Sequence, residues 1–208
     1  MENIYLYPKW IRLWHIINAI LFIILIITGL SMQYTDKGNS AYMVGFAKAV
    51  KWHNAAAMIL TANYVFFILG NVFTKNGRYY RISRENFRKN LGKQLRYYAF
   101  GIFSGEKHPF PVTPERKFNP LQKLSYVLAM YIGLPLLIAS GLVLLFPEVA
   151  PKVIFGVSGL VITDVIHISM GFLLSIFLII HIYTCTLGAK PLTLFRSMIT
   201  GYHPAGDL

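Results

Sequence analysis

Residues 160–187 read LVITDVIHISMGFLLSIFLIIHIYTCTL, and this stretch decides the fold that the chain is expected to adopt. It is long and apolar enough for one membrane-spanning helix, because about 20 such residues cross a hydrocarbon layer of roughly 30 Å. Two histidines, His167 and His181, lie within it, 14 residues apart. At helical spacing both rings point from one face, about 21 Å apart along the axis. Imidazole is costly inside a membrane, so the pair indicates two bound groups, one in each leaflet.

The composition indicates a multi-pass membrane protein. Of the 208 residues, 55% are hydrophobic and 13% are charged, whereas a soluble domain carries about 25% charged residues. The net charge of +12 fits membrane topology and anionic lipid better than nucleic acid, because the apolar residues occur in long runs. The single cysteine, Cys185, excludes an internal disulfide and a cysteine-ligated zinc or iron–sulfur site. We therefore expect no nucleic-acid partner.

Four apolar segments predict an all-α bundle of four transmembrane helices in a single membrane domain, residues 1–208. The expected helix bounds are about 10–32, 51–73, 120–146 and 160–187. Residues 84–103 carry apolar side chains at helical spacing among basic neighbours, which predicts an amphipathic helix on the anionic leaflet. Loops 33–50 and 147–160 carry little net charge, and most Lys and Arg residues lie between helices two and three. The positive-inside bias therefore predicts cytoplasmic N and C termini.

On this topology, four histidines fall into two pairs at matching depths. His15 begins the first helix and His181 ends the fourth, so both are expected at the cytoplasmic side. His53 begins the second helix and His167 lies early in the fourth, so both are expected at the outer side. Two imidazoles at one depth on facing helices can bind a haem iron axially. The pattern therefore predicts two b-type haems, each held by one pair.

Other chemistries fit the histidines less well. A dinuclear carboxylate site needs Asp or Glu on facing helices, and Asp164 alone lies near a membrane segment. A zinc site needs three or four ligands at one place, whereas these histidines come in pairs, and His108 and His203 lie in polar segments. A structural histidine is the alternative at any single position. A small metal or proton-coupled transporter is the alternative function, and a passive anchor for a partner enzyme is a third interpretation.

Several residues beside the histidines are expected to support a flat cofactor. Arg12 lies one turn before His15 and Lys51 two residues before His53, so either can pair with haem propionates or simply extend to the membrane surface. Gly171 follows His167 by one turn and can accept a ring face or pack against a helix.

The first and third helices share a short similar segment. The segment IITGL at residues 26–30 resembles IASGL at residues 138–142. The glycines of the two segments, Gly29 and Gly141, are interpreted as clearance for a flat ligand, with helix packing as the alternative.

The opening of the chain resembles a known family. Residues 7–15, YPKWIRLWH, followed by an apolar run and TGL at residues 28–30, resemble bacterial b561-type dihaem cytochromes. That family includes the cytochrome b subunits of membrane-bound Ni/Fe-hydrogenase and thiosulfate reductase and the gamma subunit of formate dehydrogenase. The similarity covers essentially all four helices. The family's axial ligands match His15, His53, His167 and His181.

The resemblance implies electron transfer between a redox partner on the periplasmic face and the membrane quinone pool, in the bacterial cytoplasmic (inner) membrane. It also implies a quinone site near an Asn-x-x-Gln-Lys stretch before the third helix. The sequence NPLQK, which starts at Asn119, matches, so Asn119, Gln122 and His181 are the expected contacts for menaquinone or ubiquinone. The family's glycine is Leu121 here. Asn119 before Pro120 is equally typical of a helix N-cap.

We expect a subunit of a larger oxidoreductase rather than a stand-alone enzyme, because 208 residues leave no room for a catalytic domain outside the membrane. The expected partner is a periplasmic-side redox subunit of the iron–sulfur, multihaem c, hydrogenase or molybdoenzyme type. The outer loops, residues 33–50 and 147–160, are the expected docking surface.

Overall fold

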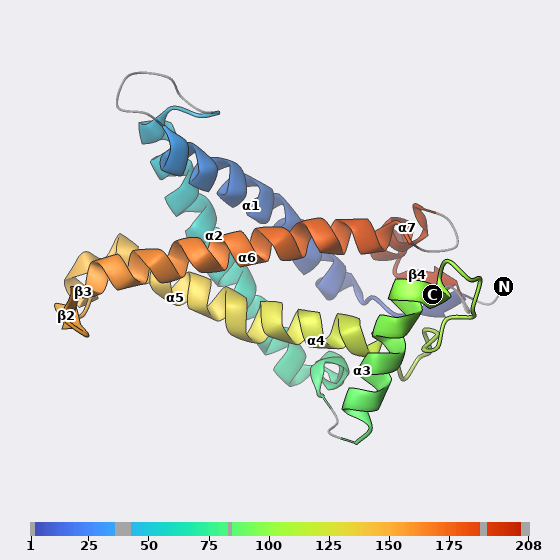
Figure 1. Cartoon of the computed structure of the whole chain (residues 1–208). Coiled ribbons are helices and arrows are strands. Elements are labelled where there is room, and N and C mark those ends of the chain that lie inside the picture. Colours follow the sequence, from blue (N-terminus) through green and yellow to red (C-terminus); the bar gives the residue numbers. More distant parts are fainter. Residues whose placement is uncertain (1–2, 36–42, 83–84, 188–190, 205–208) are drawn as a thin grey trace. The chain divides into compact units, whose positions relative to one another are not determined.

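The computed structural model describes residues 3–35, 43–82, 85–187 and 191–204. These ranges are mostly helical, and four helical segments within them are long and apolar enough to cross a membrane (Figure 1). The spanning segments are α1 (Lys9–Tyr34), α2 (Phe46–Phe73), the run Pro120–Leu145 and α6 (Gly159–Cys185). The prediction of an all-α membrane protein with four spans is confirmed. The largest difference in bounds is at α2, which begins at Phe46 instead of Lys51.

A wider turn interrupts the third spanning segment. Helices α4 (Pro120–Leu128) and α5 (Leu134–Leu145) are joined by a π-helical turn, η3 (Ala129–Gly133). Pro135 lies in the first turn of α5. Proline has no N–H to donate, and its ring crowds the carbonyl four residues earlier. The irregular turn accommodates this defect in the helical ladder.

The chain forms two compact units, whose boundaries fall inside the spanning helices, and we describe each unit by itself. The first unit contains Met1–Arg12, Gly70–Ile132 and Phe177–Leu208. The second contains Leu13–Leu69 and Gly133–Ile176.

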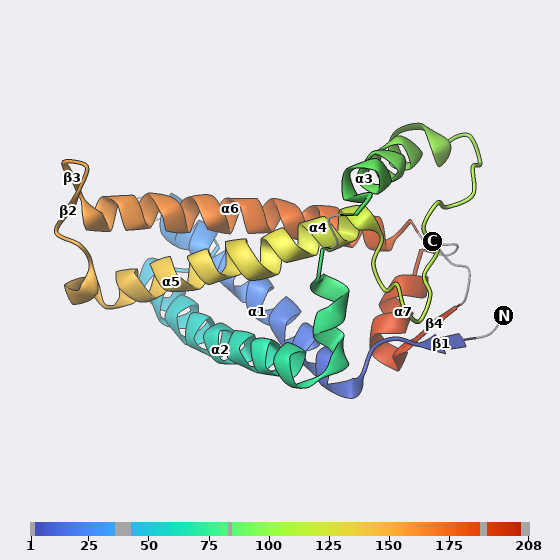
Figure 2. The ribbon, with the colours of Figure 1, turned by 90° about the horizontal axis from the view of Figure 1, so that it is seen from below.

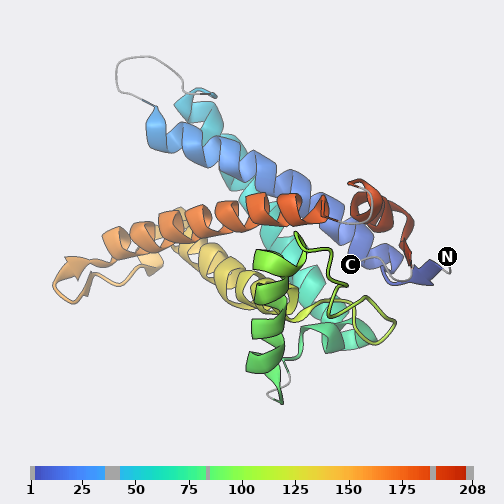
Figure 3. The ribbon, with the colours of Figure 1, turned by 45° about the vertical axis from the view of Figure 1, so that its right-hand side comes forward.

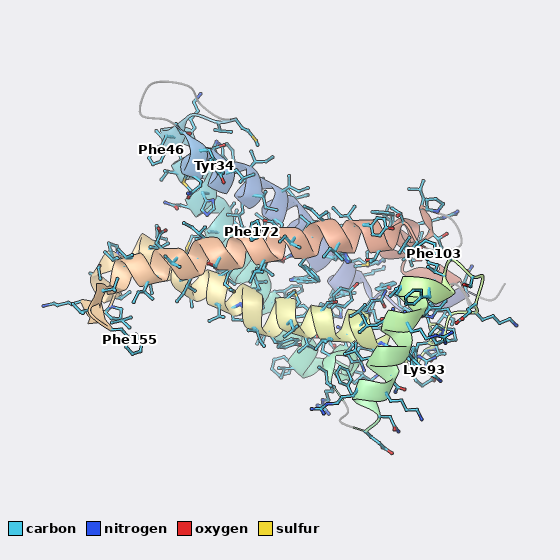
Figure 4. The ribbon with its side chains drawn as sticks, viewed as in Figure 1. Tyr34, Phe46, Lys93, Phe103, Phe155 and Phe172 are labelled. Atoms are coloured by element: carbon cyan, nitrogen blue, oxygen red, sulfur yellow. The ribbon has the colours of Figure 1, made fainter. Side chains whose placement is uncertain are left out.

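In the second unit, α5 and the first part of α6 run side by side, joined by a short hairpin (Figures 1 and 2). The hairpin pairs β2 (Val153–Ile154) with antiparallel β3 (Val157–Ser158). Its two loop residues have positive φ angles, 52° at Phe155 and 79° at Gly156, as a tight two-residue hairpin turn requires. The Phe155 side chain is fully exposed at the tip and points away from the ribbon (Figure 4).

In the first unit, the two ends of the chain pair with each other. Strand β1 (Asn3–Tyr5) pairs antiparallel with β4 (Tyr202–Pro204), which follows α7 (Thr193–Thr200) (Figure 2). Gly201 ends α7 with a φ of 91°, and its carbonyl accepts the N–H groups of Leu6 at 3.0 Å and Tyr7 at 3.2 Å. The pairing brings the two described ends together, which agrees with an even number of spans. The cytoplasmic assignment of that side remains a prediction.

The polar segment between α2 and α4 contains the expected surface helix. Helix α3 (Phe87–Arg96) continues into a π-helical turn, η2 (Tyr97–Gly101), and lies across the start of α4 (Figure 3). Residue 84, where the helix was predicted to begin, lies outside the described residues. Large apolar side chains on α3 and just beyond it are exposed, as on a membrane surface: Leu95, Phe100 and Phe103. The side chain of Lys93 points away from the ribbon (Figure 4).

Candidate haem-binding site

The predicted outer pair, His53 on α2 and His167 on α6, comes together within the second unit. The two ring centroids are 6.3 Å apart, with an interplanar angle of 69°. A metal–imidazole bond is about 2.0–2.1 Å long, so two such bonds on opposite sides of one metal, plus half of each ring, separate the centroids by about 6 Å. The observed centroid spacing is therefore compatible with both imidazoles binding one iron.

Thr28 fixes the protonation of the His53 ring. The Thr28 hydroxyl lies 2.7 Å from the carbonyl oxygen of Ile24 and 2.9 Å from Nδ1 of His53. A hydroxyl has a single proton, and the carbonyl can only accept, so Thr28 donates to Ile24 and accepts from the Nδ1–H of His53. The Nε2 lone pair of His53 is therefore available to a metal.

The His167 ring has the same protonation. Its Nδ1 lies 3.2 Å from the carbonyl oxygen of Leu137, which can only accept a hydrogen bond. The Ser140 hydroxyl lies 3.1 Å from the same nitrogen and donates to the carbonyl of Leu136 at 2.7 Å. Nδ1 therefore carries the proton and Nε2 is the free ligand atom. Metal-binding histidines typically donate their second N–H to such an acceptor, which fixes ring orientation.

The sequence similarity between segments 26–30 and 138–142 has a structural explanation. Thr28 and Ser140 occupy equivalent places in the IITGL and IASGL segments, and each contacts Nδ1 of one histidine. The glycines that follow lie against the same two rings. A Cβ atom at Gly29 would be 3.6 Å from the nearest ring atom, and a Cβ atom at Gly141 would be 2.9 Å away. Each segment therefore provides both an acceptor for a histidine and room for its ring.

The predicted cytoplasmic-side pair, His15 and His181, is divided between the two units. In the first unit, His181 stacks on Phe177 with centroids 5.8 Å apart, and its Nδ1 lies 3.4 Å from the hydroxyl of Tyr126. In the second unit, the half-buried His15 meets the edge of Trp14, with centroids 6.3 Å apart. The pairing of these two histidines stays a prediction.

The surroundings of His15 fit a ligand with acceptor atoms. Among the described residues, four buried side-chain polar atoms have no hydrogen-bond partner. Three of them are Nε of Arg12, Nε1 of Trp14 and Oδ1 of Asn18, all within one turn of His15. A buried unsatisfied N–H costs about 1–3 kcal/mol. The oxygens of haem propionates are strong acceptors for such donors.

The other predicted contacts receive less structural support. Lys51 is exposed and forms no ion pair with any described residue. A Cβ atom at Gly171 would lie 3.9 Å from the Leu137 side chain, which is an ordinary packing contact. No group of three or more metal-binding side chains occurs within the described ranges, so a zinc-type site receives no support there.

The expected quinone stretch forms the start of α4. Oδ1 of Asn119 accepts the N–H of Gln122 at 2.9 Å, and Oε1 of Gln122 accepts the N–H of Asn119 at 3.1 Å. This capping box confirms the N-cap interpretation of Asn119. Nδ2 of Asn119 donates to the Tyr98 hydroxyl at 3.1 Å and has a second N–H for another acceptor.

A buried lysine was not singled out from the sequence. Lys117 is 3% exposed, and Nζ lies 4.4 Å from the centre of the Tyr7 ring. Burial lowers the pKa of Lys117 to about 7. A lysine in a basic polar segment gives no sequence signal for burial, because similar residues nearby are exposed.

Comparisons with known proteins show the family of the chain. Residues 6–201 match the family described as prokaryotic cytochrome b561. A curated relative from Escherichia coli (strain K12), named "Putative cytochrome YdhU", is 41% identical over 202 residues, which cover 97% of this chain and 75% of that protein. No solved structure matches the chain. The resemblance inferred from the opening of the sequence is confirmed.

Proposed function

Because the chain belongs to the prokaryotic cytochrome b561 family, a family of haem-binding electron-transport proteins of the bacterial inner membrane, we propose that it carries electrons between an outer-face redox partner and the membrane quinone pool. Bound haem supplies one-electron redox chemistry at its iron. The observation that carries the proposal is the approach of His53 and His167, whose centroids are 6.3 Å apart with both Nε2 atoms free.

We propose two b-type haem sites. His53 and His167 hold the outer haem, and their Nδ1–H groups are fixed by the hydroxyls of Thr28 and Ser140. These contacts keep both rings neutral, which axial ligation requires, and they increase the basicity of the ligands. In this proposal the absence of a side chain at Gly29 and Gly141 lets the His53 and His167 rings lie close to the neighbouring helices. That the two glycines also leave room for the porphyrin is proposed from the sequence alone.

The second haem of the proposal is held by His15 and His181 at the cytoplasmic side. The aromatic ring of Phe177 and the hydroxyl of Tyr126 hold His181 in place. The unpartnered Nε of Arg12 and Nε1 of Trp14 supply hydrogen-bond donors for propionate oxygens. Lys51 is proposed for a propionate at the outer side on its sequence position alone.

Quinone is proposed to bind near Asn119, Gln122 and His181. Support comes from the second N–H of the Asn119 amide, which can donate to a quinone carbonyl. A small pocket in the same unit borders the start of α4; its lining includes Phe118 and Pro120, on either side of Asn119, together with charged side chains of both signs. Electrons reaching this side would be transferred to quinone with uptake of protons from the adjoining aqueous phase.

The redox partner is proposed to dock on the outer face, at the loop 147–160. The fully exposed Phe155 at the tip of the β2–β3 hairpin supports this assignment, because exposed aromatic side chains often anchor interfaces. In the other proposed docking loop, 33–50, residues 36–42 lie outside the described residues. The chemical type of the partner is an inference from the resemblance to subunits of hydrogenase and molybdoenzyme complexes.

Optical spectra of the purified protein test the proposal. We expect a reduced-minus-oxidised spectrum with a b-type haem band, and reduction of that haem by an added quinol analogue. The His167→Ala variant should lose the outer haem, whereas His108→Ala, which alters a histidine of the polar segment, should retain the wild-type spectrum. Absence of a b-type band from the wild-type protein would refute the proposal and favour a histidine-based transporter.

A further inference from the structure

Lys117 lies in an unusual position for a lysine of a membrane protein. It precedes α4 in the first unit, and its side chain is almost completely buried. Nζ lies over the rings of Tyr7, Tyr79 and Phe118, at 4.4, 5.5 and 5.7 Å from their centres. It also donates a hydrogen bond to Oδ1 of Asn76 at 3.3 Å.

The charge of Lys117 is not balanced by the described part of the chain. The ion pair recorded there joins Arg96 and Glu106, both exposed, at 2.9 Å. Contacts with aromatic faces offset part of the desolvation free energy of a buried ammonium group. Such a group normally has a carboxylate partner as well. Burial accordingly lowers the pKa of Lys117 to about 7. No carboxylate of the described residues therefore pairs with Lys117.

Lys117 belongs to the same aromatic wall as His181. Phe118, next in sequence, packs edge-to-face on Tyr126 with centroids 4.8 Å apart. Tyr126 in turn meets His181, with ring centroids 5.7 Å apart and its hydroxyl 3.4 Å from Nδ1. All these residues lie in the first unit. A ligand bound through His181 would therefore lie beside the wall that contains the unbalanced cation.

We propose that Lys117 binds a carboxylate that enters with a ligand, namely a propionate of the haem held by His181. This inference rests on the proposed role of His181 as an axial ligand. Nζ has three N–H groups, of which one donates to Asn76. Asn76 is itself fixed, because its Nδ2 donates to Asn71 at 2.7 Å. The buried Nε of Arg12, in the same unit, provides a donor for the second propionate.

A propionate explains the site better than a lipid phosphate does. The Lys117 side chain is 3% exposed, so a headgroup at the membrane surface does not reach it, whereas a ligand held by His181 would lie beside the same aromatic wall. The positive charge would favour the reduced, more negative form of that haem and so raise its midpoint potential.

The test compares three variants of the purified holoprotein. Lys117→Gln removes the charge, Lys117→Arg keeps it, and Lys107→Gln is the matched control, because Lys107 is an exposed lysine of the same unit. Optical redox titration should show a lower midpoint potential for one haem in Lys117→Gln. That haem should also transfer to apomyoglobin roughly tenfold faster, the lower end for loss of an outer-shell partner. The Lys117→Arg and Lys107→Gln variants should resemble the wild type.

A second measurement does not depend on folding of the variant. Wild-type protein reconstituted with haem dimethyl ester, whose propionates are neutral, should release one haem faster, and its midpoint should rise because negative charge has been removed. An unchanged midpoint in Lys117→Gln together with unchanged haem release from the ester-loaded protein would overturn the inference. The His181→Ala variant distinguishes failure of the His181 ligand assignment from failure of the Lys117 site. Retention of both haems there refutes the ligand assignment, whereas loss of one haem together with an unaffected Lys117→Gln variant refutes the Lys117 site alone.

Discussion

Replacement of Gly141 by alanine should displace the ring of His167 and weaken the outer haem site. The new Cβ atom would lie 2.9 Å from Cε1 and 3.4 Å from Nδ1 of that ring. An ordinary contact begins near 3.4 Å, so the ring must shift by about 0.5 Å, which is the tolerance of a preorganised site. Losses of this kind lower metal affinity about 10- to 100-fold, which corresponds to about 1.4–2.8 kcal/mol.

The matched control is Gly29→Ala, at the equivalent place in the other segment. There the new Cβ atom lies 3.6 Å from the ring of His53, an ordinary van der Waals contact. Both substitutions favour the helix itself by up to about 1 kcal/mol, so neither should prevent folding. The assay is the haem-to-protein ratio during titration with a haem acceptor. Equal haem retention in the two variants would refute the assignment of Gly141 as the site of close approach.

Three further predictions concern the polar segments and the hairpin. Phe155→Gly should raise thermal stability by about 1 kcal/mol, because glycine relaxes the backbone at φ 52°, yet weaken binding of the partner in a pull-down; unchanged binding would exclude Phe155 as an anchor. Asn119→Ser should retain the N-cap, with a stability loss below about 1 kcal/mol, but slow quinol oxidation if the amide contacts quinone; an unchanged rate would limit Asn119 to capping. Burial lowers the pKa of His108, so the unfolded chain takes up a proton first as the pH falls below about 6.5. Hydrogen-exchange protection factors of α3, which are corrected for the intrinsic pH dependence of exchange, should then fall toward pH 5, and a His108→Gln variant should not show this change.

The spanning helices were predictable because their signal is local. Apolar runs such as residues 160–187 satisfy their backbone hydrogen bonds internally and need no other segment to define them. The extra turn of α2 before Lys51 was missed, because the Phe46–Val50 stretch is only partly apolar. The π-helical turn in the third span was also missed, although Pro135 was visible, because proline allows several local solutions.

The candidate site was predictable only in part. Spacing and topology indicated the His53–His167 pair, and the structure brings the two rings together within one unit. The sequence showed the hydroxyl acceptors Thr28 and Ser140 only as part of the similarity between two segments, because residue spacing does not predict which side chain contacts a histidine. The burial of Lys117 depends on rings from distant parts of the chain, and sequence patterns carry no such information.

The haem content of purified variants tests the central claim most directly. A pyridine haemochrome assay should find two b-type haems per chain in the wild type and in His108→Ala, but one in His167→Ala and one in His181→Ala. A ratio of two in either of the last two variants, or a ratio of one in the wild type, would contradict the assignment of two bis-histidine haem sites.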